Sequence, residues 1–365
     1  MTRAAVAASR RVVVKVGTSA LTTPSGRLDR RRIDRFAQEL CDQVDGGRQM
    51  VCVSSGAIAA GLGPLGLSRR PTDMASLQAA AAVGQSHLMH AYSTAFENRG
   101  RACGQVLLTR QDVMHRHAYV NALNTFRRLL ALGCVPVVNE NDTIATDEIR
   151  FGENDLLAAL VANLVGADAL LLLSDVEGLH ESADGPVVGE VETVDDTVEQ
   201  MATGGGSGLS SGGMKSKLAA AKIATRSGIP VVIGRFRSGA VGRILSGGRV
   251  GTLFHPVEGR MAKRKAWIAF ATVARGKVMV DEGARSAIAA GNRSLLAAGV
   301  RGVEGTFSPG DAVDIVDDGG VAFARGLVGF SSDELARVAG MDSRAVGELV
   351  GRGREVVHRD ELVVL

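Results

Sequence analysis

The chain has 365 residues, of which 45% are hydrophobic and 22% are charged, and this length is enough for two domains with separate cores. Its formal net charge of +3 indicates no polyanionic partner, and an aromatic content of 4% argues against stacking platforms for single-stranded nucleic acid. The four cysteines form no C-x-x-C pair, which favours reduced thiols in a cytoplasmic protein over a disulfide framework or a zinc site.

Neither a targeting segment nor a protein-bound metal is predicted. The basic, Ala-rich start MTRAAVAASRR runs directly into RVVVKVG, unlike a signal peptide, and the most apolar run, ALLLLS at 169–174, is too short to cross a membrane. The histidine pairs His87/His90 and His115/His117 have no third ligand at a metal-binding spacing. We therefore expect a cytoplasmic protein without a membrane span.

Short apolar runs alternate with helical patterns over residues 1–258. Because these runs do not alternate between apolar and polar residues, they predict strands that are buried on both faces, in a parallel sheet. The predicted fold class is α/β, with an open, mainly parallel sheet sandwiched by helices, and ligands bind such sheets at the carboxyl ends of the strands. The runs lie at 12–16, 50–55, 104–109, 135–140, 169–174 and 229–234.

The pattern changes near the end of this region. We expect a basic linker at 259–276, a small, mostly β domain at 277–352 with short strands and frequent turns, and a C-terminal tail at 353–365. From Lys277 to Leu365 there are 10 Lys and Arg against 14 Asp and Glu, a net charge of −4. RNA binding by this domain is therefore not expected, because phosphate recognition needs a basic surface.

Lys15 lies inside the first apolar run and is followed by Gly17-Thr18-Ser19. Such a lysine is either solvated on an edge strand or fixed beside a turn whose backbone N–H groups face an anion. Because the run is apolar on both faces, the second interpretation is favoured.

The segment VSSGAIAAG at 53–61 joins a strand to a helix. Ser54 or Ser55 either caps this helix or offers a hydroxyl to a carboxylate or phosphate, and the spacing alone slightly favours the cap. A G-x-G-x-x-G pattern follows at 61–66, but it does not directly follow the strand and has no acidic strand end downstream. We interpret it as a surface loop and not as a dinucleotide site.

The triplet Glu-Asn-Asp occurs twice, at 140–142 and at 153–155, and the second copy runs into the apolar LLAALVANLV. Asp155 suits the start of that helix, where an acidic side chain is stabilising. Capping does not account for the other acids and amides, Glu140, Asn141, Asp142 and Asn154. We expect this segment to bind an ammonium group or to orient nearby lysines.

The Gly-rich segment GGGSGLSSGGMKSK at 204–217 is typical of anion binding, because glycines let backbone N–H groups approach phosphate oxygens and Lys215 and Lys217 add charge. It is not a Walker A loop, since Met214 precedes the Lys-Ser pair. A flexible linker is the alternative, but the amphipathic KLAAAKIATRSG that follows predicts a helix whose N-terminus carries the loop.

Together these segments resemble the glutamate 5-kinases, a family of the amino acid kinase superfamily that carries a C-terminal PUA domain. The matching segments cover nearly the whole chain in the family's order, and the combination of VNEND, GENDxLxA and GGMxxK is specific. Ser174 and Ser211 stand where Thr is frequent, and GEND replaces GDND, which keeps hydroxyl and carboxylate chemistry. The longest segments are VVVKVGTSAL, VSSGAIAAG, VPVVNENDTIAT, GENDLLAALVANLVGADALLLLSDVEGL and SGLSSGGMKSKLAAAKIA.

The resemblance implies ATP-dependent phosphorylation of the L-glutamate side-chain carboxylate to L-glutamyl 5-phosphate, the first step of proline biosynthesis. It also implies Mg²⁺ with the nucleotide, feedback inhibition by proline and a homo-oligomer. Lys15 and Lys217 would contact phosphate, and Asp155 would organise them. Glutamate would be bound by Ser55, Asp142 and Asn154, and ATP by Lys15, Ser174, Asp175, Ser211, Gly212, Gly213, Met214, Lys215, Ser216 and Lys217.

The chemistry agrees with this resemblance. A glutamate carboxylate, with a pKa of about 4.3, is already ionised at neutral pH and needs no general base. Positioning and cations should therefore dominate catalysis. Two alternatives stay open: a related kinase that acts on acetylglutamate, aspartate, carbamate or a nucleotide, which the fold alone does not exclude, and an RNA-binding or RNA-modifying protein acting through the PUA-like domain.

Overall fold

The computed structural model describes residues 3–23, 25–114, 116–144, 153–182, 185–202, 208–257, 265, 268–269, 274–291, 293–350 and 355–365. The chain divides into two compact units, Met1–Arg260 and Met261–Leu365. The basic segment that we expected as a linker falls largely outside the described residues.

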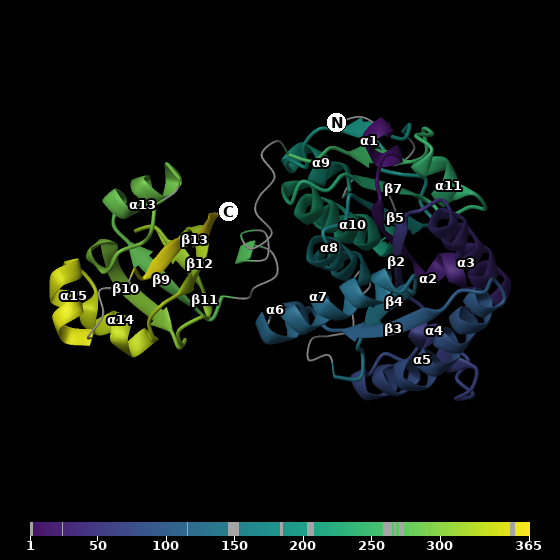
Figure 1. Ribbon diagram of the computed structural model, residues 1–365, viewed down its shortest axis with the longest axis horizontal. Coiled ribbons are helices and arrows are strands. Elements are labelled where there is room, and N and C mark those ends of the chain that lie inside the picture. The colour runs from purple at the N-terminus through teal and green to yellow at the C-terminus, as the bar shows by residue number, and fades with distance from the viewer. Residues whose placement is uncertain are drawn as a thin grey trace. The chain divides into compact units, whose positions relative to one another are not determined.

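The first unit is built on an eight-stranded sheet in the order β3-β4-β2-β1-β5-β7-β8-β6 (Figure 1). Neighbouring strands run parallel, except that β7 and β8 are antiparallel. The predicted mainly parallel α/β sheet is thus confirmed. The strands are β1 (Arg11–Val16), β2 (Gln49–Ser54), β3 (Cys103–Leu108), β4 (Val135–Glu140), β5 (Ala169–Ser174), β6 (Glu190–Val191), β7 (Val231–Arg235) and β8 (Thr252–Phe254).

Helices cover both faces of this sheet, with α3, α5 and α11 on one face and α7, α8 and α10 on the other (Figure 1). The helices of the unit are α1 (Arg3–Ala7), α2 (Thr18–Leu21), α3 (Arg30–Asp45), α4 (Ala57–Leu62), α5 (Met74–Glu97), α6 (Arg110–Met114), α7 (Arg116–Ala131), α8 (Glu153–Val165), α9 (Asp196–Met201), α10 (Gly208–Arg226) and α11 (Ala240–Leu245).

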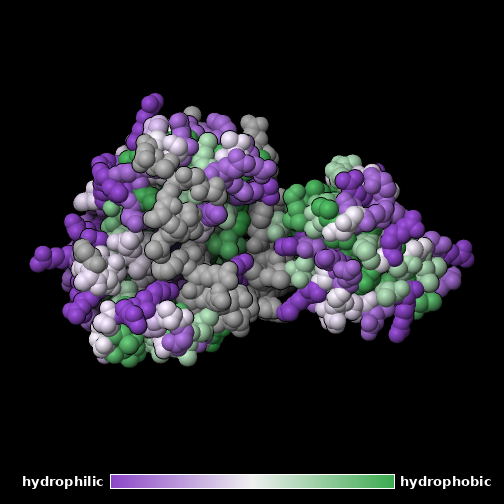
Figure 2. All heavy atoms as spheres, turned by 180° about the vertical axis from the view of Figure 1, so that it is seen from behind, coloured by the Kyte–Doolittle hydropathy of each residue, from purple (hydrophilic) through white to green (hydrophobic). Residues whose placement is uncertain are grey.

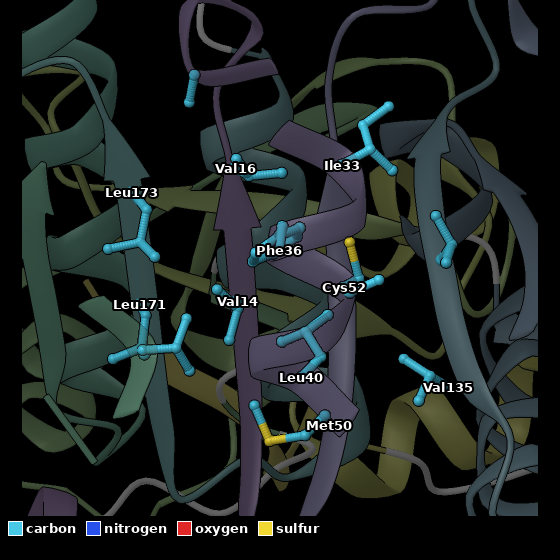
Figure 3. Packing of buried hydrophobic residues seen from close by; sticks show 14 of the residues in the cluster. Val14, Val16, Ile33, Phe36, Leu40, Met50, Cys52, Val135, Leu171 and Leu173 are labelled. Atoms are coloured by element: carbon cyan, nitrogen blue, oxygen red, sulfur yellow. The ribbon is translucent and has the colours of Figure 1, made fainter. Parts of the chain in front are cut away.

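The central strand β1 is buried on both sides, and the alternation of its side chains between the two faces determines where its one buried charged residue points. Val14 and Val16 belong to the core cluster that Phe36 and Leu40 of α3 complete (Figure 3). Because successive side chains of a strand point to opposite faces, Lys15 points to the other face, where α8 packs against β1. The sequence of one strand therefore directs an ammonium group toward α8.

Helices α4 and α5 pack at a distance that glycine alone permits. A Cβ atom on Gly61 would lie 1.9 Å from the carbonyl oxygen of Ala80, and one on Gly84 would lie 1.8 Å from that of Ala57. The interpretation of 61–66 as a surface loop was therefore wrong at its first two residues, because Gly61 and Leu62 belong to α4 and Gly61 is buried; residues 63–66 are exposed. This contact fixes the helix that follows the carboxyl end of β2.

The second unit contains a five-stranded sheet in the order β10-β9-β11-β12-β13, in which only the β9–β11 pair is parallel. Its strands are β9 (Gly276–Val280), β10 (Val300–Gly305), β11 (Ala312–Val316), β12 (Ala322–Val328) and β13 (Val357–Val364). Its helices are α13 (Glu282–Ala289), the 3₁₀ helix η1 (Ala297–Gly299), α14 (Ser332–Val338) and α15 (Ser343–Val350).

The last strand differs from the expected C-terminal tail at 353–365. β13 pairs antiparallel with β12, and Val357 and Leu362 lie in the core of this unit. Burying an aliphatic side chain contributes about 1.5–3 kcal/mol, so these residues stabilise the sheet and close one side of it.

Hydrophilic side chains are spread over the outer surface of each unit on the face that Figure 2 shows. Among the described residues, none of the helices has both the length and the apolar character needed to cross a bilayer. In the same part of the chain, no three His, Cys, Asp or Glu side chains gather as a metal-binding group.

Candidate active site

One cleft of about 290 Å³ opens at the carboxyl ends of β1, β2, β4 and β5. Parallel sheets bind ligands at this edge. The polar residues that line it come from strand ends, from the segments after them and from the starts of α8 and α10: Lys15, Thr18, Ser19, Ser55, Arg70, Asn139, Glu140, Asp142, Asn154, Asp155, Ser174, Asp175 and Lys217.

Two lysines from distant parts of the chain converge on one carboxylate in this cleft. Nζ of Lys15 lies 2.6 Å from Oδ1 of Asp155, and Nζ of Lys217 lies 3.2 Å from Oδ2. The exposed fractions of Lys15, Asp155 and Lys217 are 5%, 0% and 7%. Two ammonium groups against one carboxylate leave one positive charge in excess, which suits a ligand that carries phosphate.

Asp155 is the third residue of α8 and therefore lies in its first turn, not at the cap. Its Oδ2 also accepts a hydrogen bond of 2.9 Å from Oγ of Ser216. The side chain thus serves the lysines and α10, and capping does not explain it.

The ionisation of this group follows from burial and from its partners. Burial acts to raise the pKa of Asp155, but the ammonium groups of Lys15 and Lys217 outweigh it and hold that pKa below its ordinary value. Burial lowers the pKa of Lys15, and Lys217 adds to this effect while Asp155 opposes it. The carboxyl of Asp155 is therefore ionised at neutral pH and holds both lysines in place.

The segment that we expected to be a phosphate-binding loop is helical from Gly208 onward, as part of α10. Residues two apart on a helix point in nearly opposite directions, since the repeat is 3.6 residues. Lys217 therefore enters the cleft while Lys215 is exposed. Gly213 lines the cleft, and its carbonyl accepts hydrogen bonds from Ser216 and Lys217. Ser211 and Gly212 belong to α10, and the predicted contacts of both with ATP stay predictions.

The other half of the cleft carries amide, hydroxyl and acid groups. Ser54 shares a hydrogen bond of 2.9 Å with the hydroxyl of Tyr92 in the core, whereas Ser55 lines the cleft. The cap of α4 is Gly56, with φ 106° and no side-chain capping bond, so the helix-cap interpretation of the serines is wrong. Asn139 donates a hydrogen bond of 2.7 Å to Gln85, which fixes its amide at the base of this half.

Asp142 has an unusual ionisation for a carboxyl at the edge of a cleft. Burial raises its pKa to about 6, and the positive charge of Arg70 opposes part of this rise. A cationic ligand would lower the pKa of this carboxyl again, because an ammonium group stabilises the ionised form, and the carboxyl would in turn bind that ligand.

Two uncharged side chains of the cleft each place a buried polar atom where no described residue forms a hydrogen bond with it. The two atoms are Oδ1 of Asn154 and Oγ of Ser174. Buried polar atoms without partners are rare in folded proteins. Asn154 lies beside Asp155 on α8, and Ser174 ends β5 next to Asp175, so two different elements each offer such an atom to a ligand in the cleft.

Comparison with known families decides which proteins share this arrangement. A model of the amino acid kinase family matches residues 10–235, and a PUA domain model matches residues 276–350. The chain belongs to the amino acid kinase family. The described cleft lies wholly inside the matched kinase region.

The relatives of this amino acid kinase match it over its whole length. It is 50% identical over 374 residues to a glutamate 5-kinase of Myxococcus xanthus, with 100% of this chain and 98% of that protein covered. A glutamate 5-kinase of Moorella thermoacetica is 46% identical over 371 residues, again with 100% and 98% covered. A solved carbamate kinase from Giardia lamblia, bound to AMP-PNP, shares the fold with a TM-score of 0.50 at 19% identity, covering 69% of this chain and all of that one.

The cleft of this amino acid kinase includes residues that the sequence did not single out. Arg70 lies in the polar stretch LSRRPTD between α4 and α5, and the proline that follows it restricts its backbone but does not indicate a ligand site. Asn139, whose amide donates to Gln85 behind the cleft lining, was also not predicted as a site residue, although it directly precedes the first Glu-Asn-Asp triplet. Its place at the carboxyl end of a buried strand was the available signal.

Proposed function

We propose that the protein transfers the γ-phosphoryl group of ATP to the side-chain carboxylate of L-glutamate and forms L-glutamyl 5-phosphate. The observation that carries this proposal is the single cleft in which Lys15 and Lys217 share Asp155 on one side and acid and amide side chains stand on the other. The names of the full-length relatives support the choice of glutamate.

The chemistry needs little from the protein beyond charge and position. The acceptor carboxylate is ionised at neutral pH and attacks the γ-phosphorus directly, and ADP leaves. The obstacle is the approach of two anions, together with the negative charge on the transferring group. Lys15 and Lys217, oriented by Asp155, offset both, since cations fixed in advance stabilise charge at no cost of reorganisation.

A divalent ion accompanies the nucleotide in this proposal. Mg²⁺ is usually held by one or two carboxylates together with substrate phosphates, and not by an all-protein cage. The cleft offers one such carboxylate, because Asp175 lines it beside Ser174. Asp175 and the phosphates would hold the ion, which neutralises phosphate charge when bound.

The substrate's ammonium group is assigned to Asp142, with Ser55 and Asn154 supplying further hydrogen bonds. Oδ1 of Asn154 accepts from a donor on the ligand, and the hydroxyl of Ser55 can donate or accept. Because the pKa of Asp142 is raised by burial to about 6, the carboxyl is mostly ionised at neutral pH and gains from pairing.

The test traps the acyl phosphate with hydroxylamine in reactions that contain ATP, Mg²⁺ and one acceptor each. Glutamate should give the hydroxamate, and acetylglutamate, aspartate and carbamate should give little. In addition, Asp142→Ala should raise the KM for glutamate far more than the KM for ATP. A reaction with another acceptor and none with glutamate would exclude the proposal, and equal changes of the two KM values would remove the role of Asp142.

We further infer that the product feeds proline synthesis and that proline inhibits by competing in the amino acid half of the cleft. Proline carries the same ammonium and carboxylate pair on one carbon as glutamate, so the groups that bind one can bind the other. Glutamate-dependent ATP turnover measured with and without proline tests this. Homo-oligomer formation, which the resemblance also implies, stays a prediction.

A further inference from the structure

The amino acid half of the cleft carries a cation that the phosphoryl-transfer scheme does not use. Arg70 lines the same cleft as Asp142, Ser55 and Asn154. The positive charge of Arg70 interacts with Asp142, because it opposes the rise that burial causes in the pKa of Asp142. Asp142 in turn opposes the fall that burial causes in the pKa of Arg70. Opposite charges thus come together from two segments, one after α4 and one after β4.

The local sequence restricts the backbone from which this guanidinium projects. Arg70 is followed by Pro71, and a residue before proline is confined to extended conformations. The preceding helix α4 is fixed against α5 through Gly61 and Gly84. Arg70 is half-buried, whereas the adjacent Arg69 is exposed. The segment therefore presents one arginine to the cleft and the other to solvent.

An α-amino acid has an ammonium and a carboxylate on one carbon, and its recognition needs both charge signs close together. Asp142 supplies the negative group. A planar guanidinium is the side chain best suited to a carboxylate, because it can donate two parallel hydrogen bonds. If the reacting carboxylate of glutamate points to Lys15 and Lys217, the α-carboxylate lies at the other end of the substrate, and Arg70 and Asp142 are the oppositely charged pair of the same cleft that can receive that end.

We propose that Arg70 binds the α-carboxylate of the substrate and thereby selects α-amino acids over carboxylates that lack this group. This inference rests on the proposed function and adds a residue that determines specificity. It differs from a role in which Arg70 only keeps Asp142 ionised, because that role concerns the ammonium group and this one concerns the carboxylate.

The test compares L-glutamate with 4-aminobutyrate, which keeps the ammonium and the reacting carboxylate but lacks the α-carboxylate. Measurements are made at about pH 8, where Asp142, with a pKa of about 6, is ionised. In Arg70→Gln, kcat/KM for glutamate should fall about 10- to 150-fold, the range for a lost hydrogen bond to a charged group. The value for 4-aminobutyrate should change less than about threefold, because its contacts are kept.

Two further variants separate the explanations. Arg70→Lys keeps the charge without the paired donors and should recover part of the preference for glutamate, while Arg69→Gln is the matched control and should leave both substrates unchanged. The KM for ATP and the melting temperature of Arg70→Gln report on folding. Where turnover of 4-aminobutyrate is too slow, calorimetric dissociation constants for the two compounds give the same comparison.

Equal losses for glutamate and 4-aminobutyrate in Arg70→Gln would overturn the inference, because Arg70 would then act through Asp142 or through the shape of the cleft. A wild-type protein that does not phosphorylate glutamate would overturn the proposed function instead, and this inference with it. A selective loss for glutamate alone supports the assignment.

Discussion

Replacing Asp155 by Asn removes the one carboxylate that holds two buried ammonium groups. The amide keeps a single acceptor oxygen, so it can serve Lys15 at the 2.6 Å position or Lys217 at the 3.2 Å position, but not both. Its NH₂ group then faces the other ammonium. Breaking a buried ion pair from one side costs about 3–5 kcal/mol, because an uncompensated charge is left behind.

This cost should be visible as heat sensitivity of the kinase unit. For a domain of this size, each kcal/mol shifts the melting temperature by about 2–4 °C, so Asp155→Asn should melt about 6–20 °C below the wild type. A non-hydrolysable ATP analogue should reduce the difference in melting temperature between the variant and the wild type, because its phosphates supply the missing negative charge to the lysines. The kcat of Asp155→Asn should fall about 100-fold or more, since both lysine ammonium groups lose their orientation.

The matched control is Ser216→Ala, which removes an uncharged donor, the hydroxyl that donates a hydrogen bond of 2.9 Å to the same carboxylate oxygen, and leaves all three charges in place. Loss of that bond should cost about 1.5–3 kcal/mol, the range for a hydrogen bond to a charged group, which is less than the loss of the carboxylate charge. Calorimetric unfolding of the three proteins, with and without the analogue, gives the comparison. If Asp155→Asn melted within about 2 °C of the wild type, or if Ser216→Ala were equally harmful, the carboxylate charge would not be what holds the lysines.

Three other expectations follow from the site and the fold. Lys217→Ala should lower kcat about 100- to 1000-fold in steady-state assays with little change in the KM for glutamate, and near wild-type turnover would refute its role. The KM for glutamate should rise about tenfold per pH unit below the Asp142 pKa of about 6, because protonation removes the ammonium's partner; Asp142→Asn should show a high KM without this slope. Gly84→Ala should destabilise the protein by about 1–3 kcal/mol or more in urea unfolding, since the new Cβ would lie 1.8 Å from a carbonyl oxygen of Ala57, whereas Gly63→Ala, with open space around it, should be neutral.

The layered sheet was predictable because its strands are unbroken apolar runs, and such runs leave few other structures open. Lys15 and Asp155 were predictable for a related reason: a charged residue inside or beside an apolar run has to be paired once the run is buried. Gly61 was not, because its close contact with α5 depends on a tertiary approach that no local pattern records.

The C-terminal strand and Arg70 escaped prediction for physical reasons of their own. The segment VHRDELVV of β13 mixes charged and apolar residues without strict alternation, and its pairing with β12 bridges a long sequence separation. In the sequence, Arg70 looks like any solvated arginine before a proline. Whether its side chain is exposed depends on how α4 packs against α5, which is a tertiary contact. The helical start of α10 was misjudged because glycines suggested a loop, although the helical pattern that follows simply extends further toward the N-terminus.

Asn154 and Asp155 are consecutive at the start of α8, so their side chains project about 100° apart around one helix axis. In the proposed reaction, one helix therefore carries both the side chain assigned to the acceptor and the one that orients the phosphate-binding lysines, so the in-line approach of the reactants would depend on how α8 packs. The buried side chains Leu157, Ala158 and Val161 fix the position of this helix against its neighbours, and they thereby determine that alignment. Replacing Ala158 by a larger residue should shift α8 and so misalign the reactants, although it changes none of the side chains assigned to a substrate.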